Sequence, residues 1–152
     1  PGYIDMPDLF LLDWYYSDAV YAPLYYGYGG PGQYADRRRL ARGLDRDVLS
    51  LMPDMILVLM KASPDVIVTR IESGQSPFPR RHTNTLFKAK DAEVVLERFD
   101  EQYEESLIAR KFVIDTTVRT VEDSLLDFKA NITQYLTSED RLRILSQKAM
   151  LE

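Results

Sequence analysis

The sequence predicts an α/β fold, in which helices flank a parallel sheet in three layers. The first observation is the stretch 53–71, where the unbroken apolar run Met55–Met60 is followed by Ser63, Pro64 and Asp65. Apolar residues without alternation are typical of a parallel strand buried on both faces. Serine followed by proline is a frequent helix start. The second observation is that short apolar runs alternate with helical patterns along the chain, which favours a parallel sheet. A buried helix through Met55–Met60 is the alternative.

The composition is that of an ordinary soluble globular protein, with 45% apolar and 28% charged residues in 152. The net charge of −5 gives no support to wholesale binding of nucleic acid or of an anionic membrane. No apolar run reaches the roughly 18 residues of a membrane span. Cysteine is absent, which excludes disulfides, thiolate metal sites and a cysteine nucleophile. We therefore expect one cytoplasmic domain over residues 1–152, without a nucleic-acid or membrane partner.

The first predicted strand is Leu9–Asp13, four apolar residues followed by a carboxylate. Because the carboxyl ends of strands face the ligand crevice in open α/β sheets, Asp13 is a candidate site residue. The alternative is that Asp13 caps the next helix, which is predicted over Ser17–Tyr26 with a kink or an early end at Pro23. The glycine-rich segment 27–34 lacks the Lys and Ser/Thr of a phosphate loop, which favours a flexible connection.

A second helix is predicted over Asp36–Leu51, from apolar residues on one face. Its basic residues are interpreted as a solvated face, with an anion site, or a surface for RNA, as alternatives. These residues are Arg37, Arg38, Arg39 and Arg42. Residues 72–90 hold prolines, a glycine and several basic residues, and predict a lid-like loop. His82, in this loop, is interpreted as a surface residue.

The rest of the chain predicts a helix over 91–109, a strand at Phe112–Ile114 ended by Asp115, and two further helices. The first of these helices begins at Thr120, with Asp123 placed for a capping box. The second is the C-terminal helix, over 137–152. We therefore expect strands and helices to alternate up to this last pair of helices.

In their order and spacing, these segments resemble the carboxyl-terminal part of thymidylate kinases and deoxynucleoside kinases. The segment LVLMKASPDVIVTRI resembles the family's strand, its SPE turn and the helix at the base of its lid. The segment FVIDTT resembles the closing strand, and YYSDAVYA resembles the segment after the family's Glu-Arg or Asp-Arg pair. The resemblance extends from about Leu9 to Phe128.

The resemblance implies a nucleoside or nucleoside-monophosphate kinase-like domain of the P-loop class. Such a domain transfers phosphate from ATP, with Mg²⁺, to a nucleoside or nucleotide. The positions that match its catalytic residues are Asp13, Arg70, Arg80 and Arg81. The positions that match its acceptor pocket are Tyr15, Ser17 and Tyr21. No set of direct metal ligands is assigned.

The sequence departs from the family in two ways. The family's acid and arginine fall either on Leu12 and Asp13 or on Asp13 and Trp14, so the arginine is missing in both alignments. The sequence also has no GxxxxGK[ST] loop, on which phosphoryl transfer in this class depends.

The missing loop has a structural consequence. In the family, the strand before that loop lies between the strands that correspond to Leu9–Asp13 and Met55–Met60, and unpaired buried edges are costly. We therefore expect a kinase-like domain that is incomplete at its N-terminus, completed by an unseen segment or by a second copy in a homodimer. A rearranged sheet is the alternative. Alone, the chain is expected to be inactive and to bind ATP and Mg²⁺ weakly. The alternative function is a kinase-derived nucleotide-binding or structural module without catalysis.

Overall fold

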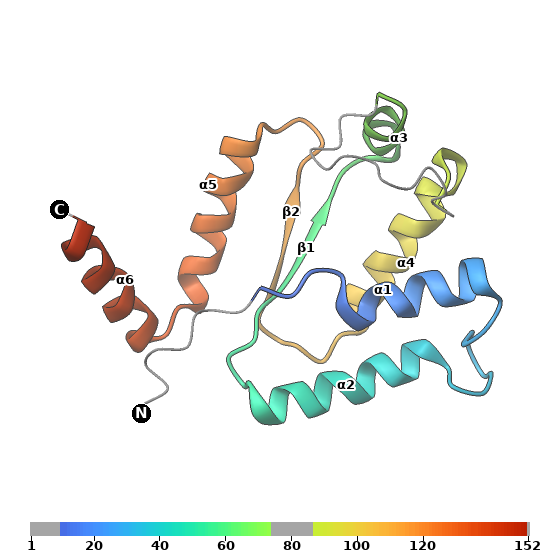
Figure 1. The fold of residues 1–152 in the computed structure, drawn as a ribbon, viewed down its shortest axis with the longest axis horizontal. Coiled ribbons are helices and arrows are strands. Elements are labelled where there is room, and N and C mark those ends of the chain that lie inside the picture. The colour runs from blue at the N-terminus through green and yellow to red at the C-terminus, as the bar shows by residue number, and fades with distance from the viewer. Residues whose placement is uncertain (1–9, 74–86, 152) are drawn as a thin grey trace.

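The computed structural model of the chain describes residues 10–73 and 87–151. Helices make up most of it, and a two-stranded parallel sheet lies between them (Figure 1). The prediction of a mixed helix and strand fold with parallel pairing is thereby confirmed. A three-layer sheet of the P-loop kinase type is not shown in the described residues.

The sheet consists of β1 (Leu57–Lys61) and β2 (Lys111–Asp115), which pair in register from Leu57 opposite Lys111 to Lys61 opposite Asp115. The run Met55–Met60 therefore contributes to a strand and not to a buried helix. Its burial differs from the prediction, because Met60 is 63% exposed. Since the described sheet stops at β1, this strand lacks the second neighbour that a fully buried strand has.

The turn after β1 leads into α3 (Pro64–Glu72), with Pro64 in the predicted first position. Ser63 has the extended backbone of an N-cap, but its side chain makes no capping bond. Its backbone N–H instead donates to Thr117 Oγ1 at 2.9 Å. The turn that follows β1 is thus tied to the turn that follows β2.

Two helices lie against opposite faces of the sheet. Before β2 come the 3-10 turn η3 (Ala89–Asp91) and α4 (Ala92–Glu105), and after β2 comes α5 (Val121–Ile132). Lys61 of β1 donates to Asp100 of α4 at 3.0 Å, whereas Phe112 of β2 packs on Phe128 of α5 with ring centroids 5.9 Å apart. Because side chains alternate along a strand, Lys61 and Phe112 point to opposite faces in the observed register.

The predicted start of α5 is confirmed. The Thr120 hydroxyl accepts from the Asp123 N–H at 3.1 Å, and the Asp123 carboxylate accepts from the Thr120 N–H in return. This is the capping box that the sequence indicates. The turn η4 (Thr133–Tyr135) then leads to α6 (Ser138–Leu151), which extends away from the sheet (Figure 1).

The N-terminal half folds against α4. It contains α1 (Trp14–Tyr21), the π-helix η2 (Ala22–Tyr26) and α2 (Arg37–Leu51). The predicted change near Pro23 is the change from α- to π-helix, since proline cannot donate the regular backbone bond. Asp36 caps α2 by accepting from the N–H groups of Arg38 and Arg39. The core between these helices consists of Tyr15, Ala19, Ala41 and Val48, with Tyr16 and Met55 packed against it.

The predicted strand Leu9–Asp13 is corrected by the structure. Its first residue lies outside the described part, and residues 10–12 pair with no strand. Phe10 and Leu12 are 74% and 87% exposed. The chain then bends in a γ-turn at Asp13, where the Trp14 N–H donates to the Leu12 carbonyl at 2.7 Å. An apolar run needs a neighbouring strand for its backbone bonds, and β1 and β2 bond to each other instead.

Several apolar side chains remain exposed. On α2, Val48 of the predicted apolar face is buried, while Leu44 is 41% exposed because the helix turns Ala41 and Asp45 inward. On α5 and α6 the exposed residues are Val121, Leu125, Leu126, Leu142, Leu145 and Met150. None of the described helices is long and apolar enough to cross a bilayer.

Candidate functional site

Arg70, in the last turn of α3, lies at the carboxyl end of the sheet. Its Nη1 and Nη2 donate to Thr116 Oγ1 at 3.0 Å and to the Thr116 carbonyl at 2.6 Å. Thr116 in turn donates from its N–H to the carbonyl of Lys61 at 2.7 Å. The end of α3 is therefore joined to the ends of both strands. Of the five N–H donors of a guanidinium, two of those of Arg70 are used within the described residues, both by Thr116.

The second strand ends on a carboxylate, as its sequence pattern predicts. Asp115 Oδ1 accepts from the Thr117 N–H at 2.8 Å. The hydrogen bonds from Thr117, together with the nearby charge of Lys61, lower the pKa of Asp115. Asp115 is thus held as an anion at the edge of the sheet where Arg70 lies.

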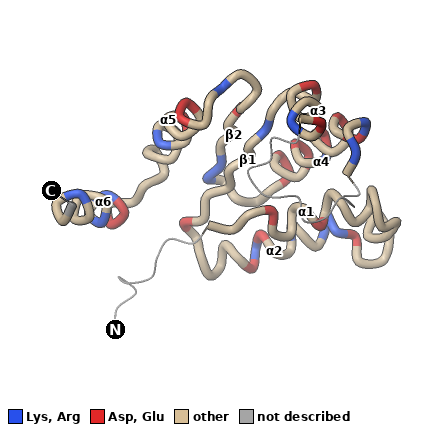
Figure 2. Tube along the Cα trace, turned by 45° about the horizontal axis from the view of Figure 1, so that its top comes forward, with Lys and Arg blue, Asp and Glu red and all other residues tan. Residues whose placement is uncertain are grey.

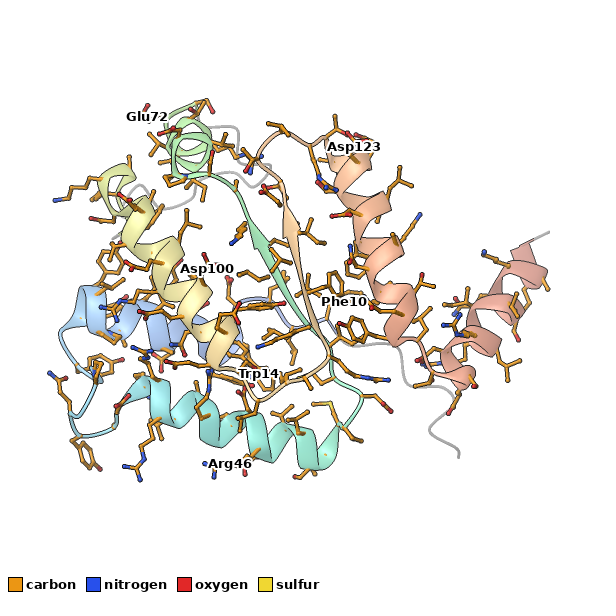
Figure 3. The ribbon with its side chains drawn as sticks, turned by 180° about the vertical axis from the view of Figure 1, so that it is seen from behind. Phe10, Trp14, Arg46, Glu72, Asp100 and Asp123 are labelled. Carbon is orange, nitrogen blue, oxygen red and sulfur yellow. The ribbon has the colours of Figure 1, made fainter. Side chains whose placement is uncertain are left out.

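A groove of about 740 Å³ lies between α4 and the carboxyl ends of the strands. Seven carboxylates line it, against two cationic side chains, Arg38 and Lys61. Six of the carboxylates are on α4: Glu93, Glu97, Asp100, Glu101, Glu104 and Glu105. Figure 2 shows the acids on α4, and Figure 3 shows Asp100 on the side of α4 that faces the sheet. Lys61 pairs with Asp100, and Arg38 pairs with Glu101 and Glu105. The groove therefore favours cations and repels a phosphate that carries no metal.

Two of the residues matched to the acceptor pocket, Ser17 and Tyr21, lie along one side of α1. The Ser17 hydroxyl donates to the Asp13 carbonyl at 3.0 Å, and the ring of Tyr21 meets that of Phe99 edge-on at 5.7 Å. Burial, and then the charge of Asp13, raise the pKa of Tyr21. The Asp13 side chain makes no capping bond, so it does not cap the next helix.

The structure brings Asp13, Ser17 and Tyr21 together on α1 and does not bring Arg70 to them. Within the described residues, the side-chain hydrogen bonds of Arg70 go to Thr116. Arg80 and Arg81 of the predicted lid-like loop lie outside the described residues, as does His82. The predicted site is thus present as two separate groups in the part of the chain that can be described.

Tyr15 points away from that side of α1, into a buried polar network. Its hydroxyl and that of Tyr16 each donate to Asp45 Oδ1 at 2.6 Å. The other oxygen of Asp45 accepts from the Leu107 N–H at 2.9 Å. Arg42 Nε lies 3.2 Å from that oxygen as an ion pair, without the alignment of a hydrogen bond.

This network joins α1, α2 and the end of α4. Asp45 is fully buried. Burial alone would raise its pKa, but the bonds from Tyr15 and Tyr16 and the charge of Arg42 outweigh burial, so the pKa is lowered. Burial and the bond to Asp45 raise the pKa of Tyr16 to about 12. The network thus holds one carboxylate and two neutral phenols at neutral pH.

Asp45 was not predicted as a site residue from the sequence. A signal was present, since Asp45 stands between Ala41 and Val48 on the helix face that is buried. The basic cluster of α2 is mostly paired with acids, as in the ion pair of Arg37 with Asp18 at 3.1 Å. This leaves little of the cluster for an anion.

No group of three or more His, Asp or Glu side chains suited to a metal ion occurs within residues 10–73 and 87–151. Comparison of the chain with models of protein families, with characterised proteins and with solved structures finds no match.

Proposed function

We propose that the chain is part of a nucleoside or nucleoside-monophosphate kinase-like domain, which transfers phosphate from ATP in the intact protein. The observation that supports this most directly is the place of Arg70. It stands where two parallel strands end, and open α/β sheets bind their ligands there. A guanidinium matches the geometry of phosphate oxygens. A cytoplasmic location is part of this proposal.

The residues have distinct roles in this proposal. Arg70, with Arg80 and Arg81, stabilises the charge that develops on the transferred phosphoryl group. Asp13 lies beside the acceptor hydroxyl or the Mg²⁺, and Ser17 and Tyr21, with Tyr15 behind them, form one wall of the acceptor pocket. The acidic groove makes Mg²⁺ a requirement for ATP, because its carboxylates repel a bare triphosphate. The phosphate-binding loop comes from a further segment, since the sequence 1–152 contains no GxxxxGK[ST] motif.

The proposal is tested by thermal shift on the full-length protein, with Mg²⁺-ATP and nucleoside monophosphates as ligands. A ligand at about one hundred times its Kd stabilises by about 2.7 kcal/mol. For a domain of this size, that is a shift of roughly 5–10 °C. The variant Arg70→Gln is expected to lose most of the ATP shift, while Arg39→Gln, an exposed arginine of α2, retains it. Equal shifts for both variants would remove Arg70 from the site.

The alternative function is a kinase-derived module that binds nucleotide or acts structurally, without catalysis. Two observations favour it: two donors of Arg70 are used by Thr116, and the residue after Asp13 is Trp14. No shift with any nucleotide would support a structural module. A coupled assay for ATP turnover separates the kinase from a module that binds nucleotide, and this chain alone is expected to show none.

A further inference from the structure

The edge of β1 that faces away from β2 has backbone groups without partners. The Leu57 N–H donates to the Arg110 carbonyl, and the Lys61 carbonyl accepts from Thr116, so residues 57, 59 and 61 direct their backbone groups to β2. Alternate residues of a strand direct theirs to the other side. Val58 and Met60 thus present two N–H and two C=O groups to the open edge. No backbone bond from them to another element occurs in the described part of the chain.

The other edge of the sheet is partly closed. On β2, residues 111, 113 and 115 direct their backbone groups outward. The Tyr135 hydroxyl donates to the Lys111 carbonyl at 2.9 Å, and α5 follows directly beside this strand (Figure 1). A two-stranded sheet is only marginally stable alone. A further strand would therefore add to the open edge of β1 and not to the edge of β2.

The surroundings of β1 determine which side chains an added strand would need. On one face lies α4, where Glu93, Glu97 and Glu104 line the groove and have no ion-pair partner among the described residues. On the other face lie the exposed Met60 and the half-buried Val58. Since side chains of a strand alternate between faces, the incoming strand needs cationic residues towards α4 and apolar residues towards Met60.

The lengths agree with this arrangement. Glu93 and Glu104 are eleven residues apart on a helix, which is about 16 Å. The first, third and fifth residues of a five-residue strand, the length of β1, point to one face and span about 13 Å. Three alternate cations therefore lie within reach of the three carboxylates.

We propose that β1 binds a separate extended peptide segment, which pairs with its open edge and alternates basic and apolar residues. Backbone bonds to Val58 and Met60 give the affinity, and the carboxylates of α4 select the basic face. A second copy of this chain does not meet the requirement, because two acidic grooves would repel each other. The proposal does not depend on phosphate transfer, since it rests on the edge of β1, which pairs with β2 alone within residues 10–73 and 87–151.

The probe is a fluorescein-labelled heptapeptide of alternating lysine and valine, added to the full chain. Binding is followed by anisotropy, and backbone amide exchange is followed by NMR. We expect the peptide to protect the amides of Val58 and Met60, while those of Leu57 and Leu59, already bonded to β2, change little. A peptide of alternating glutamate and valine should not bind.

Two variants with the same change in charge test the role of α4. The variant Glu93→Gln/Glu97→Gln/Glu104→Gln should weaken peptide binding about five- to tenfold, from three exposed ion pairs. The control, Glu72→Gln/Glu122→Gln/Glu139→Gln, removes three exposed acids outside the groove and should change it less than twofold. Equal weakening by both variants would overturn the proposal, as would a lack of protection at Val58 and Met60. Protection of these amides by self-association without peptide would assign the edge to a second copy.

Discussion

The buried carboxylate of Asp45 offers the sharpest test of how the helices are held together. In the variant Asp45→Asn, one amide oxygen can still accept from Tyr15 and Tyr16. The amide nitrogen then faces the Leu107 N–H, so two donors meet where a donor met an acceptor. Arg42, 3.2 Å away, loses its charged partner as well. The substitution therefore changes the hydrogen bonding with almost no change in shape.

The size of the effect follows from these contacts. An unsatisfied buried N–H costs about 1–3 kcal/mol, and weaker bonds from the two tyrosines add to it. We expect a loss of about 2–4 kcal/mol in the free energy of unfolding. With a urea m-value of about 1–3 kcal/mol/M, the midpoint should fall by about 0.7–4 M. The control is Asp47→Asn on the exposed side of α2, which should stay within about 0.5 kcal/mol.

The pH dependence of the free energy of unfolding provides an independent check, and its direction can be predicted. The pKa of Asp45 is lower in the folded protein than its usual value, so its contribution to stability is present above the unfolded pKa of about 3.9. This contribution is lost as the pH falls through the folded pKa. The wild type should therefore lose more stability below pH 4 or so than Asp45→Asn does. If both proteins have the same urea midpoint at pH 7, the network does not hold the helices as argued.

Three further predictions concern the local backbone, and circular dichroism during urea unfolding measures them all. The variant Thr120→Ala removes the cap of α5 and should cost about 1 kcal/mol, whereas Val118→Ala, at a 93% exposed side chain, should cost almost nothing. The variant Gly43→Ala places a methyl group in open space on α2 and should stabilise by about 1 kcal/mol. The variant Gly27→Ala also meets open space, but its φ of 70° should make it destabilising by about 1 kcal/mol; stabilisation there would refute the role of this left-handed turn.

The parts of the fold predicted well from the sequence are those set by neighbouring residues. The start of α3 follows from Ser63 and Pro64, and the start of α5 from the spacing of Thr120 and Asp123. The two apolar runs predicted the strands β1 and β2. The exposure of Met60 was not predicted, because it depends on which strands lie beside β1.

Features that depend on distant residues could not be predicted in the same way. The run ending at Asp13 has the composition of a strand but no strand to pair with. Asp45 is buried because Tyr15 and Tyr16, about 30 residues earlier, bring their hydroxyls to it. The resemblance implies that Arg70 lies at the base of the lid-like loop, and this stays a prediction. Its hydrogen bond to Thr116 was not predicted, because that contact joins residues 46 apart.

The γ-turn at the start of α1 has a mechanical consequence. Asp13 and Trp14 have φ angles of 63° and 31°, which residues with side chains seldom adopt, and each costs about 1–3 kcal/mol. The backbone at this bend is strained, and the bend keeps residues 10–12 from continuing in line with the helix. If residues 10–12 paired with a sheet edge, the free energy gained would include the relief of this backbone strain as well as the new hydrogen bonds. In exchange, the chain would lose the bond from the Trp14 N–H to the Leu12 carbonyl and the bonds from Ser17 to the Asp13 carbonyl.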